Sequence, residues 1–344
     1  MDTTIFLLAS SDVHIFFPIA AVILGLILLV WSADRFVAGA ASLAKLLGMS
    51  PLLIGMIIVG FGTSAPEMCV SILAAVNNSP DIALGNAYGS NIANIALILG
   101  VTAVISPIFY ARSVIKKELP VLFVSTLLCL PMLIDFKLSR FEGLLMIIMF
   151  AIAMIGLSIK SKQKEETTEA STLAEGEEVK SYSSMWVSIF WLMIGLIVLV
   201  ASSQMLVWGA KDIATRCHVN DLVIGLTIVA VGTSLPELAS SIAAALKKEH
   251  DIALGNIIGS NLFNTLMVVG LASSVKSFKF SEEVVYRDFS FVIGLTLLLF
   301  FPIISIFFGS KKPRISRILG GLLLMSYCIY TIYLISLAFE TSNG

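Results

Sequence analysis

Charged side chains are scarce in this sequence. Asp, Glu, Lys and Arg make up 13% of the 344 residues and hydrophobic residues 58%, whereas soluble domains carry about 25% charged residues. This composition excludes a soluble fold. No basic stripe is present that could contact phosphates, so nucleic acid is excluded as a partner.

Cysteine and histidine are also rare. The four cysteines lie far apart, mostly in apolar segments, and no two of them have C-x-x-C spacing. The three histidines fall at the ends of apolar segments or between them, where we expect them to be solvated. Zinc and copper sites usually contain these two residue types. We therefore expect packing cysteines, and neither a transition-metal site nor a bound cofactor.

The hydrophobic residues gather in about ten blocks. They cover residues 15–39, 51–76, 84–106, 119–135, 141–160, 185–209, 222–246, 252–275, 289–309 and 317–338. About 20 apolar residues cross a bilayer core of about 30 Å as a helix. Residues 1–14 contain two aspartates but no basic residue, unlike a cleaved signal peptide. The sequence therefore predicts an all-α polytopic membrane protein with ten transmembrane helices.

Lys and Arg are unevenly distributed between alternate loops. Of the 22, 15 fall on the side opposite to the N-terminus, and cytoplasmic loops carry the excess of these residues. This predicts that both termini lie outside. The stretch 161–184 is acidic and of low complexity, which predicts a flexible cytoplasmic linker. An ion-sensing role for its six glutamates is the less favoured alternative.

The chain contains an internal duplication. Residues 52–100 align without gaps with residues 222–270, at an offset of 170, and 25 of the 49 positions are identical. Five spans per unit force the second unit to enter the membrane from the opposite side. We therefore predict a first five-helix repeat at 15–160, the linker at 161–184 and a second, inverted repeat at 185–338. Many secondary transporters have this architecture, with a midplane site between the halves; a duplicated scaffold without a site is the alternative.

Two buried carboxylates are the main candidates for function. Glu67 and Glu237 are the only acids near the centre of an apolar block, where a charge costs at least about 2.5–3.5 kcal/mol. No Lys or Arg lies at a matching depth to neutralise them. Either both are protonated and form helix–helix hydrogen bonds, or a cation sits between them.

The residues around these glutamates are small or polar in both halves. Each glutamate ends a Gly-Thr-Ser-x-Pro-Glu string, and Pro66 and Pro236 deprive the carbonyls of Gly62 and Gly232 of their helical partner. We expect each helix to break or kink there and to free carbonyls for an ion.

The neighbouring blocks carry two polar stripes. Asn86, Ser90 and Asn94 form one, Asn256, Ser260 and Asn264 the other, each with i, i+4, i+8 spacing; we favour ion ligation over interhelical hydrogen bonds for them. The glycines between them favour close helix packing. All candidate ligands are oxygens, the set that Ca²⁺ and other hard cations prefer.

The paired strings resemble the two α-repeats of the cation/Ca²⁺ exchanger superfamily, specifically its prokaryotic sodium/calcium exchanger branch. The resemblance covers the whole ten-span chain and implies alternating access in the plasma membrane of a bacterium or archaeon. It also implies a set of ion ligands: side chains of Thr63, Ser64, Glu67, Ser90, Asn94, Thr233, Ser234, Glu237 and Ser260, with main-chain oxygens of Gly60 and Ala230.

Two positions refine the resemblance. Asn264, which we include in the candidate site, matches an aspartate in some members, including potassium-dependent ones, so K⁺ co-transport is disfavoured. In the proton/Ca²⁺ branch a glutamate follows Gly-Asn, whereas here Ala87 and Ile257 follow it. Na⁺ is therefore the favoured counter-ion.

The resulting hypothesis is an antiporter, not an enzyme, that exchanges Na⁺ for Ca²⁺. Its partners are the lipid bilayer and these two ions, and one chain is expected to suffice for transport. A proton/Ca²⁺ antiporter is the nearest alternative. An intramembrane hydrolase using Glu67 and Glu237 as acid and base is an alternative from another class, and a passive channel is a third.

Overall fold

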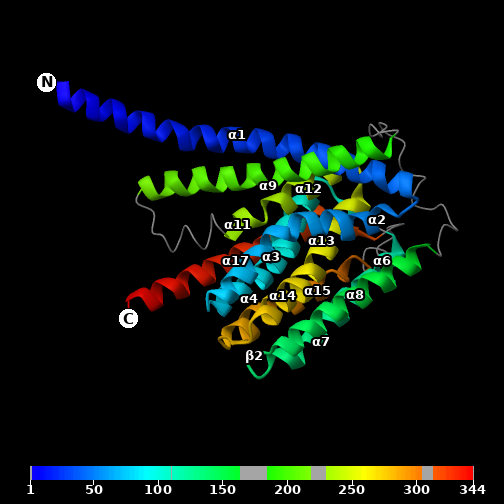
Figure 1. The fold of residues 1–344 in the computed structure, drawn as a ribbon. Helices are drawn as coiled ribbons and strands as arrows, with labels where there is room; N and C mark the ends of the chain where they lie inside the picture. Colours follow the sequence, from blue (N-terminus) through cyan, green and yellow to red (C-terminus); the bar gives the residue numbers. More distant parts are fainter. Residues whose placement is uncertain (1, 110, 163–183, 218–229, 304–312, 344) are drawn as a thin grey trace.

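The computed structural model describes residues 2–109, 111–162, 184–217, 230–303 and 313–343. Helices form most of this structure (Figure 1). In the first half they are α1 (Asp2–Leu47), α2 (Pro51–Ile54), η1 (Gly55–Val59), α3 (Gly60–Val76), α4 (Pro80–Ile92), η2 (Ala93–Ile98), α5 (Leu99–Ile105), α6 (Arg112–Lys116), α7 (Glu118–Leu133) and α8 (Arg140–Lys162).

The second half repeats this order. It contains α9 (Met185–Arg216), α11 (Ala230–Thr233), α12 (Leu235–Leu246), α13 (His250–Leu262), η5 (Phe263–Val268), α14 (Val269–Val275), η6 (Val284–Phe289), α15 (Ser290–Leu298), η7 (Phe301–Ile303) and α17 (Arg317–Asn343). The segments η1, η2, η5 and η6 are π-helical turns within longer helices, and η7 is a 3₁₀ turn.

Seven helices in the described residues are long and apolar enough to cross a membrane. They cover 16–47, 51–76, 80–105, 140–158, 185–216, 250–275 and 317–337. The other three predicted blocks coincide with α7, with α11 and α12, and with η6, α15 and η7. Residues 163–183 of the predicted linker and parts of two predicted spans, 222–229 and 304–309, lie outside the described residues. The count of ten spans therefore stays a prediction.

The two longest helices, α1 and α9, pack side by side and antiparallel along one flank of the molecule (Figure 1). Glycine allows the close approach, because a Cβ at Gly39 would lie 2.7 Å from the main-chain nitrogen of Leu192. A Cβ at Gly195 would lie equally close, 2.7 Å, to the nitrogen of Phe36. In the most apolar 18-residue stretch of each helix, 33% of the residues of α1 and 28% of those of α9 are buried, so both present wide apolar faces that suit lipid.

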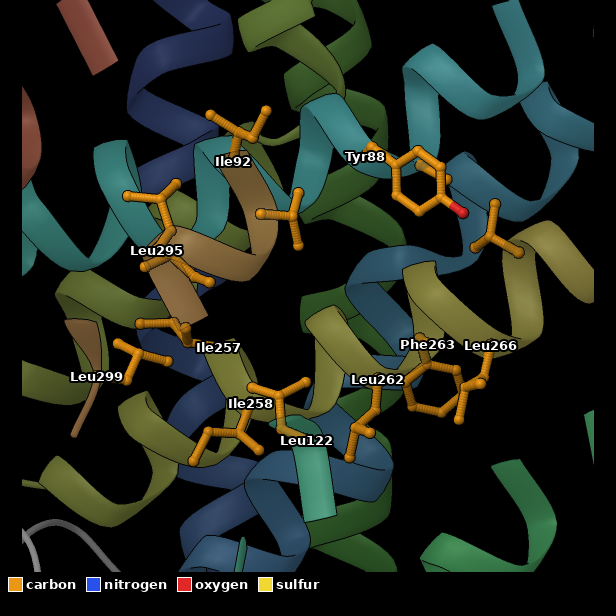
Figure 2. Close-up of a cluster of buried hydrophobic side chains, with 14 of the residues drawn as sticks. Tyr88, Ile92, Leu122, Ile257, Ile258, Leu262, Phe263, Leu266, Leu295 and Leu299 are labelled. Carbon is orange, nitrogen blue, oxygen red and sulfur yellow. The ribbon is translucent and has the colours of Figure 1, made fainter. Parts of the chain in front are cut away.

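The centre of the molecule is the helix formed by α13, η5 and α14. In its most apolar 18-residue stretch 94% of the residues are buried, against 11% in that of α17. Figure 2 shows its apolar side chains, including Ile258 and Phe263, together with Tyr88 of α4, Leu122 of α7 and Leu295 of α15. The central helix thus holds the polar stripe of the second half inside a tightly packed apolar cluster.

Two short antiparallel strand pairs connect the halves. Strand β1 (Ile108–Phe109) pairs with β4 (Arg314–Ile315), and β2 (Lys137–Leu138) pairs with β3 (Phe278–Lys279). By the sequence offsets of 170 and 177, β1 is equivalent to β3 and β2 to β4. Each half therefore pairs its first strand with the second strand of the other half, as expected if a two-fold axis relates them.

Candidate functional site

Most of the candidate residues are buried in the interior of the helical body. Gly60, Thr63, Ser64 and Glu67 lie on α3, and Ser234 and Glu237 lie at the start of α12. The stripe residues Ser90 and Ser260 lie on α4 and α13, and Asn94 and Asn264 on η2 and η5. Nine side chains are buried: Thr63, Ser64, Glu67, Ser90, Asn94, Ser234, Glu237, Ser260 and Asn264. Thr233 is half-buried, and Ala230 is the first residue of α11, with its side chain outside the described set.

The helix of the second half breaks where its proline predicts. Helix α11 ends at Thr233, Ser234 has non-helical angles (φ −93°, ψ 6°), and α12 starts at Leu235 with Pro236 in its first turn. The carbonyl of Gly232, which has no donor at Pro236, accepts a hydrogen bond from Ser203 Oγ of α9 at 2.9 Å. A side chain from another helix thus satisfies the freed carbonyl.

Of the break or kink predicted at Pro66, the structure shows no break. Helix α3 continues from Gly60 to Val76 with Pro66 inside it. A single missing hydrogen bond does not end a membrane helix when the bonds of the flanking turns remain. The position equivalent to Ser203 is Ala33, which has no hydroxyl to offer, so the two halves differ locally despite the identical motif.

Each polar stripe ends in a π-helical turn. Asn94 lies in η2 and Asn264 in η5, and these two turns correspond at the offset of 170. Such turns are rare and frequently mark functional sites. Spacing of i, i+4, i+8 assumes regular α-helical turns, and the sequence contains no clear signal for the wider π-helical turn at either asparagine.

Direct contacts bring α3 together with the helices of the second half. Ser64 Oγ donates to Glu237 Oε1 at 3.4 Å. A Cβ at Gly60 would lie 3.2 Å from the main-chain nitrogen of Ser260. Residues 173 and 200 positions apart in the sequence therefore share one buried region.

Several buried polar atoms of the candidate residues have no hydrogen-bond partner among the described residues. Buried polar groups normally have one, so each such atom needs an explanation. They come from both halves and from four different segments. The atoms are Glu67 Oε2, Glu237 Oε2, Ser234 Oγ, Asn264 Oδ1 and both amide atoms of Asn94.

Two stripe residues, Asn86 and Asn256, are central to this network through interhelical hydrogen bonds, although their spacing favoured ion ligation; the ligand set implied by the family resemblance does not include them. Asn86 Nδ2 donates to the main-chain carbonyl of Glu67 at 3.0 Å. Asn256 Nδ2 lies 3.4 Å from the carbonyl of Glu237, and Thr63 Oγ1 donates to Asn256 Oδ1 at 3.3 Å. Their place in the repeat was visible in the sequence, whereas their partners on other helices were not.

The cysteines and His250 depart in part from expectation. Cys129 is buried in the core, but Cys69, Cys217 and Cys328 are exposed. His250, expected to be solvated, is half-buried with its ring centroid 5.8 Å from that of Phe109, because the first residue of α13 faces strand β1. The side chains of His14 and His218 lie outside the described set.

Comparison with known proteins decides the family. The family model described as "Sodium/calcium exchanger protein" matches residues 17–158 and 187–336. The chain belongs to the sodium/calcium exchanger family. It is 44% identical to the putative antiporter CaxA of Alkalimonas amylolytica over 315 residues, which cover 92% of this chain and 98% of that protein. It is 30% identical to the sodium/calcium exchanger MaX1 of Methanosarcina acetivorans, covering 91% and 97% of the two chains.

A solved structure of this family has the same fold. The sodium-calcium exchanger NCX_Mj, soaked with 10 mM Na⁺ and no Ca²⁺, matches 94% of this chain and 99% of its own, with a TM-score of 0.77 and 31% identity. The prediction of an all-α, multi-pass membrane protein of the prokaryotic exchanger branch is confirmed. The family is one of secondary transporters that exchange cations with Ca²⁺, so this chain is an antiporter and not a hydrolase.

Proposed function

We propose that this exchanger moves Ca²⁺ against Na⁺ by alternating access, with the ions bound near the midplane between the two halves. The ligands would be the side chains of Thr63, Ser64, Glu67, Ser90, Asn94, Thr233, Ser234, Glu237, Ser260 and Asn264, with main-chain oxygens of Gly60 and Ala230. The proposal includes an inverted pair of repeats, 15–160 and 185–338, joined by a cytoplasmic linker at 161–184.

The observation that carries this proposal is the pair of buried glutamates from equivalent positions of the two halves. The ion pairs found among the described residues are Asp212–Arg216, Asp34–Lys247 and Arg287–Asp288. None of them involves Glu67 or Glu237. One Ca²⁺ would balance the two carboxylates, which two or three Na⁺ could also share, and the partnerless oxygens around them would complete the coordination.

The same charges provide a reason for obligatory exchange. An ion-free site would carry two carboxylates through an occluded state, at a cost of several kcal/mol. Return of the ion-free site is therefore slow, and a second kind of cation must accompany the return step. All proposed ligands belong to one chain, so a monomer contains the whole site.

Flux measurements in proteoliposomes test the choice of counter-ion. We expect an imposed Na⁺ gradient to drive uptake of ⁴⁵Ca²⁺, with no requirement for K⁺. Uptake that depends on a pH gradient and not on Na⁺ would contradict this proposal and indicate a proton/Ca²⁺ antiporter. Ca²⁺ flux without any counter-ion on the opposite side would indicate a channel.

Substitution of Glu67 tests the site. Glu67→Gln keeps the shape of the side chain but removes one of the two charges, so we expect exchange to fall by about 100-fold or more, in line with about 3–5 kcal/mol for breaking a buried charge pairing. Membrane insertion should be unchanged. The matched control is Glu282→Gln, an exposed glutamate, which should transport normally. Full Ca²⁺ transport by Glu67→Gln would rule out the proposed site.

A further inference from the structure

Asn256 makes more contacts around the glutamates than its place in the stripe predicts. It is buried on α13. Its Nδ2 group donates to Ser241 Oγ at 3.0 Å and to Ser240 Oγ at 3.1 Å, and lies 3.4 Å from the carbonyl of Glu237. All three partners belong to α12, directly after the helix break. The amide nitrogen thus fixes the first turns of α12 to α13.

The amide oxygen of Asn256 faces the proposed ion ligands. It lies 3.3 Å from Thr63 Oγ1 of the first half and 3.5 Å from Ser260 Oγ of its own helix. The Thr63 hydroxyl also lies 3.1 Å from the carbonyl oxygen of Val59, so its single proton can turn to either acceptor. A hydroxyl that binds a cation must turn its proton away and offer a lone pair. An amide carbonyl is a neutral acceptor suited to receive that proton. Asn256 therefore offers one acceptor to the hydroxyls of two ligands in different halves.

The first half contains an equivalent arrangement. Asn86 Nδ2 donates to the carbonyl of Glu67 at 3.0 Å and to Ser71 Oγ at 2.8 Å. Asn86, Glu67 and Ser71 correspond to Asn256, Glu237 and Ser241 at the offset of 170. The same amide thus holds the same carbonyl in both halves, which points to a shared role at the two glutamates.

We propose that Asn256 is a positioning residue of the ion site. It orients the hydroxyls of Thr63 and Ser260 and holds the turn that carries Glu237, without binding the ion itself. Asn86 does the same for the turn that carries Glu67. This inference rests on the proposed function, because it assigns a role within the same site.

Ion affinity is the property that should change. Asn256→Ala removes two weak acceptor contacts and the anchor of the Glu237 turn, so we expect the KM for Ca²⁺ to rise about tenfold, as losing one or two buried hydrogen bonds implies. The maximal rate should change less. Calorimetric titration of the purified protein with Ca²⁺ should show the same loss of affinity without any transport step.

Asn91→Ala is the matched control. Asn91 is also a buried asparagine that joins the halves, through a 2.7 Å hydrogen bond to Thr265. Within the described part of the chain, its side chain forms no hydrogen bond to either glutamate turn. A general packing role would give both variants the same loss of folded protein with unchanged KM. We expect only Asn256→Ala to change the KM. Asn256→Ser is measured in parallel, because its smaller change favours recovery of folded protein.

A double-substitution cycle tests the contact across the halves. We expect Thr63→Ala to weaken Ca²⁺ binding less in an Asn256→Ala background than in the wild type, whereas Thr63→Ala and Asn91→Ala should be additive. Wild-type Ca²⁺ affinity in both Asn256 variants would overturn the inference, as would additivity with Thr63→Ala. Failure of the proposed function would show separately, as wild-type protein that does not exchange Na⁺ for Ca²⁺.

Discussion

Identical motifs are supported by different neighbours in the two halves. In the second half Ser203 of α9 donates to the carbonyl freed by Pro236, whereas the equivalent residue of α1 is Ala33. The helix breaks at Ser234 in the one half and continues through Pro66 in the other. The sequence repeat therefore predicts which residues meet, but the environment of each glutamate depends on a non-repeated neighbour.

Removal of the Ser203 hydroxyl should destabilise the protein. Ser203→Ala leaves the buried carbonyl of Gly232 without its donor, which costs about 1–3 kcal/mol, so we expect a lower thermal midpoint in detergent. Ser202→Ala is the control, because Ser202 is also buried and donates to the carbonyl of Leu199 within its own helix at 3.0 Å. Equal midpoints for the two variants would contradict this account.

At the scale of elements, glycine pairs set two equivalent helix crossings. A Cβ at Gly143 of α8 would lie 2.6 Å from the carbonyl oxygen of Gly270 of α14, and a Cβ at Gly320 of α17 would lie 2.8 Å from that of Gly100 of α5. Gly100 corresponds to Gly270 and Gly143 to Gly320 at the offsets of 170 and 177. The second helix pair is thus the repeat of the first.

Alanine at such a crossing should force the helices apart. We expect Gly143→Ala to lower the free energy of unfolding by about 1–3 kcal/mol, as overpacking does, measured as a lower thermal midpoint. The control is Gly156→Ala on the same helix, where no heavy atom lies within 4 Å of a built Cβ. Alanine there should be neutral or stabilising by up to about 1 kcal/mol. A Gly143→Ala protein with the thermal midpoint of the wild type would contradict this prediction, because it would show that α8 moves to accommodate the added methyl group without loss of stability.

Helix content and the candidate residues could be predicted from the sequence for a simple reason. Apolar blocks have to be helices in a bilayer, and an ungapped repeat places Glu67 and Glu237 at equivalent depths. The π turns at Asn94 and Asn264, the continuity of α3 through Pro66 and the bonds of Asn256 could not be predicted. They depend on which side chains meet across helices, and that information is absent from the periodicity of a single helix.

At the scale of the whole molecule, both termini lie at the same end. In Figure 1 the start of α1 and the end of α17 lie at the left, while the end of α8 and the start of α9 lie at the right. Termini at the same end imply that the chain crosses the membrane an even number of times. The assignment of the left end to the outside stays a prediction from the distribution of Lys and Arg.

Cysteine labelling tests this orientation. Cys69, Cys217 and Cys328, which are exposed, are first replaced by alanine. We expect a membrane-impermeant thiol reagent added to intact cells to label Lys137→Cys on strand β2, and to label Ser184→Cys, before α9, only after the cells are opened. Both positions are exposed. The reverse pattern would invert the topology and would leave the site unchanged.

The strand pairs also determine when the protein can complete its fold. During synthesis β1 and β2 emerge in the first half, but their partners β4 and β3 belong to the second. Ile108 thus cannot pair until Ile315 has been made. Unpaired strand edges are sites of wrong association, so the first half remains incomplete until Ile315 of the second half has been made. Neither half can complete its strand pairs without the other, because β4 of the second half pairs with β1 of the first.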